Sequence, residues 1–227
     1  MRIYKFGGAS VKDANGVKNL ITILNTLGSE KTLIVVSAMG KTTNSLELVV
    51  KNYFDNKEEL QYSINEVFTF HNKILNDLFN DNKHQIFSDV KEILENLRIF
   101  LKRNKSPDYS FVYDQVVIFG EILSTKIINS YLNHSNIRCN WLDARTLIKT
   151  DSKYRDANLN WEITKNSISD GVNTKLLNIT QGFIASDSNN FSTTLGREGS
   201  DYTAAIFAYC LNAESVTIWK DVPGVLN

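Results

Sequence analysis

A segment between Thr193 and Ala205 combines residue types that bind small anions. It contains Arg197, Glu198 and Asp201 together with two glycines and four serine or threonine side chains, and an apolar helical run follows it. The first turn of a helix favours anions, because free backbone N–H groups and the helix dipole place partial positive charge there. A guanidinium adds two parallel hydrogen bonds to a carboxylate. The segment predicts a site for a charged small molecule; the alternative is a surface ion pair between Arg197 and a nearby acid.

A second glycine-rich segment, Lys5 to Ser10, follows the first apolar stretch of the chain. Open α/β sheets bind ligands where strands end, and Gly7 and Gly8 would let the backbone approach phosphate oxygens because they carry no Cβ. Lys5 could stabilise the charge on a phosphoryl group during transfer. The spacing is neither that of a P-loop nor that of the dinucleotide fingerprint. The alternative interpretation is a tight strand-to-helix turn with a solvated lysine.

Three further positions could contribute polar groups to a site. The loop from Ser37 to Asn44 is rich in small and hydroxyl residues, which could hydrogen-bond a carboxylate or cap the next helix. Glu121 lies in an apolar helical stretch, where a buried carboxylate needs a partner unless it faces the surface. Asp221 follows an apolar stretch and could contact a ribose or simply form a turn. The three histidines have spacings that match no metal site: His71, His84 and His134.

The elements around these positions predict an α/β fold. An apolar stretch at Arg2–Phe6, a helical period that ends at Gly28 and a second apolar stretch at Thr32–Val36 form a strand–helix–strand unit, which is typical of a parallel sheet. Further strands are expected at 136–142, 176–184 and 215–219. A helix is expected from Asp201 to about Leu211, with Ser200 as its cap.

The middle of the chain predicts a helical insertion at about 45–110. Residues 45–104 lack glycine and proline, and their apolar residues keep a helical period. A break at 105–108 separates them from a long helix, roughly Tyr113 to Asn133, that carries Glu121.

The composition excludes several classes of protein. Lysine plus arginine equals aspartate plus glutamate at 25 each, so no global charge attracts nucleic acid or anionic lipid. No stretch is long and apolar enough to span a membrane, and no secretory leader is visible at the start of the sequence. Cys139 and Cys210 are isolated thiols, which fits a reducing compartment. We therefore expect a cytoplasmic protein with no nucleic-acid or membrane partner.

Taken in their order along the chain, these segments resemble those of aspartate kinases (aspartokinases) of the amino-acid-kinase family. The resemblance covers essentially the whole chain, and the GGAS-type opening together with the LGREGSDYTA-type loop is highly specific. The segments that carry it are 5–10, 37–44, 119–121, 180–184, 193–205 and 218–224.

The resemblance implies a three-layer α/β/α sandwich with a mostly parallel sheet, as in carbamate-kinase-like folds, plus the helical insertion. Residues 1–227 would then be part of a kinase catalytic domain truncated at its C-terminus, without the remaining kinase strands and the regulatory ACT domains. The implied reaction is the ATP-dependent phosphorylation of the L-aspartate side-chain carboxylate to 4-phospho-L-aspartate, the first step of lysine, threonine and methionine biosynthesis. Mg²⁺ would arrive with ATP, with no metal site in the protein itself, and the full-length parent would be a homo-oligomer.

The same resemblance assigns roles to individual residues. The expected catalytic residues are Lys5, which would stabilise the transferred charge, and Asp201, which would position the reacting groups. The expected ATP-binding residues are Lys5, Phe6, Gly7, Gly8, Lys220, Asp221 and Leu226. The expected aspartate-binding residues are Thr43, Glu121, Arg197, Glu198, Gly199 and Ser200. Among them Arg197 would bind the α-carboxylate and Glu121 the ammonium, so we expect Lys5 and Arg197 to share one pocket.

The chain departs from the family pattern at four positions. Ala9 stands where a threonine is usual, Glu198 where a glycine is frequent, Lys220 where a threonine is common and Leu226 where a tyrosine often lies. Two alternatives remain open. One is another kinase of this fold, acting on glutamate, acetylglutamate or a nucleoside monophosphate; the other is a catalytically incomplete fragment that binds ligands only weakly.

Overall fold

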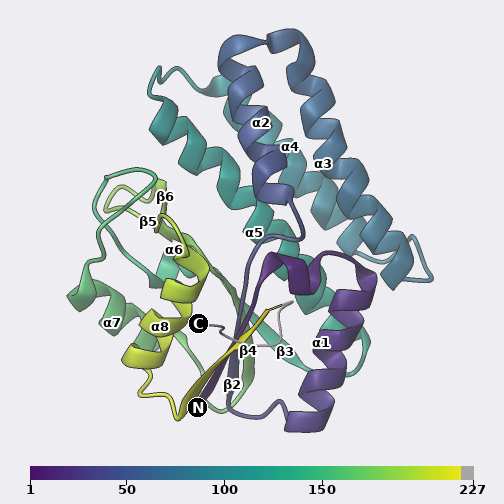
Figure 1. The fold of residues 1–227 in the computed structure, drawn as a ribbon, viewed down its shortest axis with the longest axis vertical. Coiled ribbons are helices and arrows are strands. Elements are labelled where there is room, and N and C mark those ends of the chain that lie inside the picture. Colours follow the sequence, from purple (N-terminus) through teal and green to yellow (C-terminus); the bar gives the residue numbers. More distant parts are fainter. Residues whose placement is uncertain (221–227) are drawn as a thin grey trace, which may run out of the picture.

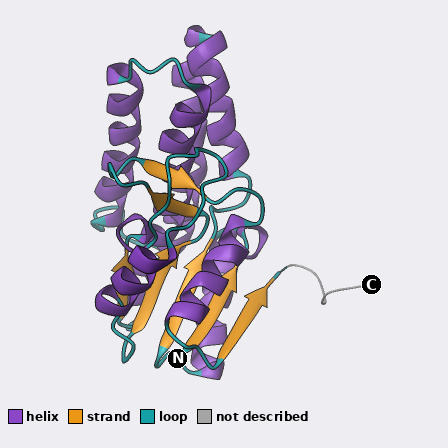
Figure 2. Ribbon diagram, turned by 90° about the vertical axis from the view of Figure 1, so that its left-hand side faces the viewer, coloured by secondary structure: helices purple, strands orange, loops and turns teal. Residues whose placement is uncertain are grey.

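A parallel sheet forms the centre of the protein, whose computed structural model describes residues 1–220 (Figure 1). Its strand order is β3-β4-β2-β1-β7, and every pair of neighbours is parallel. The strands are β1 (Arg2–Phe6), β2 (Thr32–Val36), β3 (Cys139–Leu142), β4 (Leu177–Gln181) and β7 (Ser215–Trp219). The strands of this sheet all point toward the helices at the top of Figure 2, so their carboxyl ends meet at one edge of the sheet. The predicted mostly parallel sheet is confirmed.

Helices cover both faces of this sheet, which confirms the three-layer sandwich. Alternate residues of a strand face opposite sides. Tyr4 and Ile34 pack with α1 (Ala14–Leu27) and α5 (Tyr109–His134), whereas Ile3 and Leu33 pack with the helices of the other face. Those helices are α6 (Ala144–Leu147), α7 (Trp161–Gly171) and α8 (Gly199–Cys210). The continuous apolar sequence of β2 follows from this two-sided cover.

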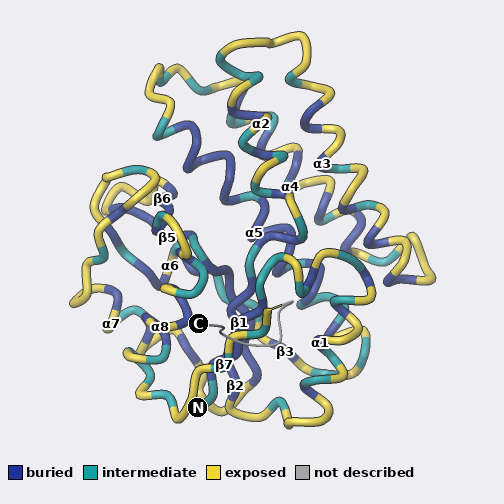
Figure 3. Tube along the Cα trace, in the orientation of Figure 1, coloured by how far each residue is buried: buried dark blue, intermediate teal, exposed yellow. Residues whose placement is uncertain are grey.

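The predicted helical insertion is present and lies above the carboxyl edge of the sheet (Figure 1). It consists of α2 (Thr42–Asp55), α3 (Lys57–Leu78) and α4 (Ile86–Arg103), which pack against the long helix α5. The predicted break is also found, because α4 ends at Arg103 and α5 begins after Asp108. The Asp108 carboxylate caps α5 by accepting from Ser110 N at 2.8 Å and Phe111 N at 3.3 Å. Much of α5 is buried (Figure 3), so it forms the spine between the insertion and the sheet.

The structure corrects three details. The strand expected at 176–184 is divided, because Phe183 has a positive φ of 70° and the chain leaves the main sheet there. It continues as β5 (Ile184–Ser186), which pairs with β6 (Ser192–Thr194) in a separate antiparallel hairpin. The strand expected at 136–142 begins only at Cys139. Ser200 does not cap α8, because the helix begins at Gly199 and its N-cap is Glu198, whose side chain makes no capping hydrogen bond.

The helices of residues 1–220 include none with the length and apolar character that crossing a membrane requires. Two short elements complete the fold: the 3-10 turn η1 (Gly8–Val11) after β1, and the α6 turn after β3.

Candidate active site

A buried lysine–aspartate ion pair lies where β1 ends. Lys5 Nζ is 2.7 Å from Asp201 Oδ1, and Lys220 Nζ is 3.3 Å from Asp201 Oδ2. The Lys5 side chain is only 7% exposed and that of Asp201 is 20% exposed. Partial burial acts to raise the pKa of Asp201, but the two ammonium groups outweigh it and lower the pKa below its usual value. Asp201 is therefore an anion held between two cations.

Three elements bring these groups together. β1 and β7 are neighbours in the sheet, with Lys5 in register with Ile218, so Lys5 and Lys220 emerge at the same edge. Asp201 lies in the first turn of α8, where the helix dipole favours a carboxylate. The ends of β1 and β7 and the N-terminus of α8 therefore converge at Lys5, Asp201 and Lys220.

Glu121 is a second buried acid near this edge. The residue is 3% exposed, and its Oε1 accepts a hydrogen bond of 3.3 Å from Ala38 N. Its Oε2 has no partner among the described residues. Burial raises the pKa of Glu121 to about 8, and the backbone N–H groups of Ala38 and of Glu121 itself offset this only in part. Among residues 1–220 no lysine or arginine pairs with Glu121, although a buried carboxylate was expected to need a partner.

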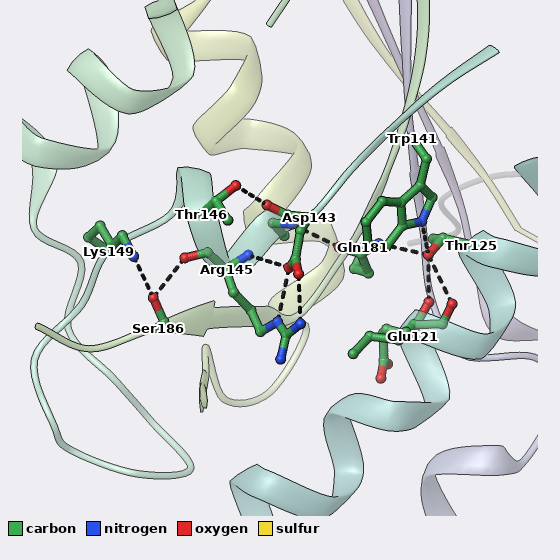
Figure 4. Close-up of polar contacts among 11 residues, drawn as sticks. Glu121, Thr125, Trp141, Asp143, Arg145, Thr146, Lys149, Gln181 and Ser186 are labelled. Atoms are coloured by element: carbon green, nitrogen blue, oxygen red, sulfur yellow. Dashed lines mark hydrogen bonds and ion pairs between the residues drawn. The ribbon is translucent and has the colours of Figure 1, made fainter. Parts of the chain in front are cut away.

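A hydrogen-bond network holds the turn of α5 that carries Glu121 (Figure 4). Thr125 Oγ1 donates to Glu121 O at 2.9 Å and accepts from Gln181 Nε2 at 2.7 Å and from Trp141 Nε1 at 3.0 Å. Gln181 Oε1 in turn accepts from Ala144 N at 2.8 Å. Helix α5 is thus tied to β3, β4 and the start of α6, which fixes the position of the Glu121 carboxylate relative to the sheet.

A cavity of about 230 Å³ connects the two acids. Its walls come from the ends of β1 and β2, the start of α2, α5 and the loop before α8. The residues that line it are Lys5, Ser37, Thr43, Glu121, Phe183, Gly196, Glu198, Gly199, Ser200 and Asp201. The cavity is therefore lined by an ammonium, three carboxylates, hydroxyl groups and the first turn of a helix.

Arg197 does not share this cavity with Lys5. Its side chain is exposed and is not among the lining residues, whereas its neighbours Gly196 and Glu198 are. Both neighbours have positive φ values, 73° and 56°, and the turn they form directs Arg197 to solvent. The expected shared pocket of Lys5 and Arg197 is therefore corrected: the Arg197 loop contributes to the cavity, but its guanidinium does not.

The glycine-rich turn after β1 is shaped by close packing. A Cβ on Gly8 would lie 2.6 Å from Ala38 O, so this position needs glycine for contact with the loop after β2. Gly7 N donates to Trp219 O at 3.3 Å, and the ring of Phe6 stacks on that of Trp219. Phe6 and Gly7 thus border β7, Gly8 borders the loop after β2, and none of the three lines the cavity. Asp221 and Leu226, the other expected ATP-binding residues, lie outside the described residues.

Sequence reasoning did not assign three of the lining residues. Ser37 follows β2 in the loop that was singled out for its hydroxyl groups, but no role was given to it. Phe183 and Gly196 were visible only as parts of longer motifs. No sequence signal places Phe183 beside Gly196, because the pairing of β5 with β6 does so: Leu195 N donates to Phe183 O at 2.9 Å at the end of this hairpin.

Within residues 1–220, no group of three or more histidine, cysteine, aspartate or glutamate side chains is arranged to hold a metal ion. Asp201 is already paired with two lysines. A divalent ion at this site would therefore depend on oxygen ligands supplied by a bound phosphate.

Comparisons of the sequence with known proteins point to one family. The model of the amino acid kinase family matches residues 1–227. The lysine-sensitive aspartokinase 3 of Escherichia coli is 29% identical over 98% of this chain and 49% of its own length. A bifunctional aspartokinase/homoserine dehydrogenase 2 of Arabidopsis thaliana is 29% identical over 98% of this chain and 25% of its own length. The chain thus spans between about a quarter and a half of these relatives.

Solved structures agree with the sequence relatives. The crystal structure of E. coli aspartokinase III in complex with lysine and aspartate has a TM-score of 0.90 and 28% identity, covering 99% of this chain and 50% of that chain. The same enzyme in complex with aspartate and ADP has a TM-score of 0.88 and 29% identity, covering 99% of this chain and 50% of that chain. From its fold, its cavity and these similarities, the chain belongs to the amino acid kinase family.

Proposed function

We propose that this chain carries the catalytic site of an aspartate kinase, which transfers the γ-phosphoryl group of ATP to the side-chain carboxylate of L-aspartate. The observation that carries the proposal is one cavity that places the Lys5–Asp201 pair together with the buried carboxylate of Glu121, whose Oε2 has no partner within residues 1–220. The E. coli relative with a TM-score of 0.88 was crystallised with aspartate and ADP, which supports this choice of substrates. The product, 4-phospho-L-aspartate, is the first intermediate of lysine, threonine and methionine biosynthesis.

Glu121 is proposed to bind the ammonium of aspartate. Its unpartnered Oε2 belongs to a side chain that lines the cavity, and a buried carboxylate gains most from a cation. The substrate ammonium would supply the hydrogen bonds that Oε2 lacks. Thr43, Ser200 and the backbone of Gly199 lie on the same cavity and would bind the remaining polar groups of the amino acid.

Arg197 is proposed to bind the α-carboxylate from the rim of the cavity. Its loop already lines the cavity through Gly196 and Glu198, and its exposed guanidinium would turn inward when the substrate binds. A guanidinium forms two parallel hydrogen bonds with a carboxylate, which distinguishes an amino acid from a simple amine.

Lys5 is proposed to stabilise the charge of the transferred phosphoryl group. Phosphoryl transfer needs mainly positioning and electrostatic stabilisation, and a buried ammonium supplies the second. Asp201 holds Lys5 in place through the 2.7 Å contact and would orient the acceptor carboxylate. ATP would approach over Phe6, Gly7, Gly8 and Lys220, and Mg²⁺ arriving with ATP would neutralise part of the phosphate charge. Nucleotide contacts of Asp221 and Leu226 stay predictions. The cytoplasmic location and the homo-oligomeric state of the full-length parent also stay predictions.

Coupled ADP release with MgATP and aspartate, measured on the full-length protein, tests the proposal. We expect Glu121→Gln and Arg197→Ala each to lower kcat/KM for aspartate by about a hundredfold, since each removes a charged hydrogen-bonding partner. Glu162→Gln is the matched control, because it makes the same chemical change on the exposed surface of α7. Full activity of the Glu121 and Arg197 variants, or a preference for glutamate over aspartate, would contradict the proposal.

A further inference from the structure

We propose that Asp114, which does not line the cavity, is a positioning residue that holds the 195–199 loop in the shape that the amino-acid substrate requires. The inference rests on the proposed function for the identity of that substrate. Residues 196, 198 and 199 of this loop form one wall of the cavity. Asp114 acts on them through the strand that precedes the loop.

Asp114 makes three hydrogen bonds at the point where the loop begins. Its Oδ2 accepts from Thr194 N at 2.9 Å and from Arg155 N at 2.9 Å. Its Oδ1 accepts from Thr194 Oγ1 at 2.8 Å. Thr194 is the last residue of β6 and is followed directly by Leu195. The carboxylate therefore fixes both the backbone and the side chain of the residue from which the loop starts.

The end of the loop is joined to α8, where Glu198 O accepts from Asp201 N at 2.9 Å and from Tyr202 N at 3.0 Å, but few hydrogen bonds hold the residues before it. Leu195 N donates to Phe183 O at 2.9 Å, and Gly199 N donates to Gly196 O at 3.1 Å. Gly196 and Glu198 both have positive φ, and Glu198 has a side chain that makes this conformation unfavourable. A backbone with this geometry needs support from outside the loop.

Asp114 also holds the segment that covers the loop. Arg155 N, which it binds, lies next to Asp156, and a Cβ on Gly196 would be only 2.8 Å from Asp156 Oδ1. The segment around Arg155 is thus packed directly against the turn at Gly196. One buried carboxylate fixes the strand that enters the loop and the segment that lies against it.

Asp114 and Glu121 lie seven residues apart on α5, which is two helical turns, so they are on the same side of the helix. Both are buried. Helix α5 therefore sets the distance between the carboxylate proposed to bind the ammonium and the loop that carries Arg197.

The chemistry of Asp114 is that of a hydrogen-bond acceptor rather than an ion-pair partner. Within residues 1–220 no lysine or arginine forms an ion pair with it, and the Arg155 guanidinium instead lies 4.4 Å from the centre of the Tyr113 ring. Burial raises the pKa of Asp114 to about 6, although the hydrogen bonds from Arg155 and Thr194 act to lower it. Asp114 therefore acts by holding three hydrogen-bond donors in place: Arg155 N, Thr194 N and Thr194 Oγ1.

The neighbouring residue provides a matched control. Gln115 Oε1 accepts from Ser192 N at 3.0 Å, and Gln115 Nε2 donates to Ser192 O at 2.8 Å. These bonds join the same helix to the same strand, but at the end of β6 away from the loop. Gln115→Ala removes buried hydrogen bonds without releasing Thr194.

Hydrogen exchange of the ligand-free protein tests the positioning directly. In Asp114→Ala we expect amide exchange in residues 195–199 to become about tenfold faster, as follows from the loss of buried hydrogen bonds. Gln115→Ala should leave this segment unchanged. Asp114→Asn should also be close to the wild type, because its amide oxygen can accept both backbone bonds while its NH₂ donates to the Thr194 hydroxyl. No faster exchange in Asp114→Ala, or an equal effect in Gln115→Ala, would overturn the inference.

Kinetics of the full-length protein test the consequence for the substrate. We expect Asp114→Ala to raise KM for aspartate about tenfold with little change in KM for ATP, and Asp114→Asn to restore most of the loss. An equal rise in both KM values would overturn the specific role. If Asp114→Ala does not fold, Thr194→Val removes one of the three bonds at nearly constant shape; unchanged exchange and KM in that variant would also overturn it. An inactive wild type would refute the proposed function, while the exchange measurement would still decide the role of Asp114.

Discussion

Glu121→Gln is expected to stabilise the protein increasingly as the pH rises. The carboxyl group has a pKa of about 8 in the folded protein, against 4.5 for a glutamate side chain exposed to water. Between these values the folded protein keeps the proton while the unfolded chain releases it. The free energy of unfolding of the wild type therefore falls as the pH rises through this interval. Glutamine does not titrate, so the variant lacks this loss.

The size of the effect follows from the pKa difference. Each unit of pKa difference corresponds to about 1.4 kcal/mol, so the full interval amounts to roughly 4–5 kcal/mol. The variant also carries an NH₂ group where Oε2 has no partner, which adds a constant cost of about 1–3 kcal/mol. The difference in unfolding free energy between variant and wild type therefore reports on Glu121 through its change with pH, not through its absolute value.

Urea unfolding of wild type and variant at pH values from 5 to 8 measures this change. We expect the difference in unfolding free energy to shift in favour of Glu121→Gln throughout the interval. Glu162→Gln, on the exposed surface of α7, should show no such trend. A pH-independent difference for Glu121→Gln would refute the conclusion that this carboxyl is buried without a cation.

Three other predictions follow from the same geometry. Aspartate binding near pH 7 should release a proton, because a substrate ammonium at Glu121 lowers the pKa of that carboxyl. Calorimetry in buffers of different ionisation enthalpy measures the release. Proton release that persists in Glu121→Gln would contradict the assignment. Lys5→Met should lower kcat by about 10²–10³-fold, and the variant should still fold because Lys220 remains beside Asp201. A near-normal rate of phosphoryl transfer in single-turnover kinetics would exclude a role for Lys5 in catalysis. Gly8→Ala should cost about 1–3 kcal/mol of stability, because the added Cβ would lie 2.6 Å from Ala38 O; unchanged thermal unfolding would show that the loop after β2 can yield.

The main sheet could be predicted because its strands carry a strong signal. The run at residues 33–36 is apolar on both faces, and β1 leads directly into the turn at Gly7 and Gly8. The β5–β6 hairpin could not be predicted in the same way. Its second strand is only Ser192–Thr194, three polar residues whose burial depends on the hydrogen bonds that they donate to Asp114 and Gln115 of a distant helix.

The candidate site likewise contains residues that could be predicted from the sequence and residues that could not. Lys5, Glu121 and Asp201 could be anticipated because charged residues stand next to apolar elements, and the structure places all three on one cavity. The direction of Arg197 could not, because it depends on the left-handed backbone of Glu198, a residue that rarely adopts this conformation. Asp114 was missed because nothing in the sequence distinguishes its buried position on α5 from an exposed one.

Trapping of the product with hydroxylamine tests the central proposal most directly, because an acyl phosphate reacts with hydroxylamine to give a hydroxamate. With the full-length protein, MgATP and L-aspartate, we expect aspartyl hydroxamate to accumulate with the ADP released, and to be lost in Lys5→Met. ADP release without hydroxamate, or faster formation of glutamyl hydroxamate from glutamate, would contradict the assignment of this cavity to aspartate phosphorylation.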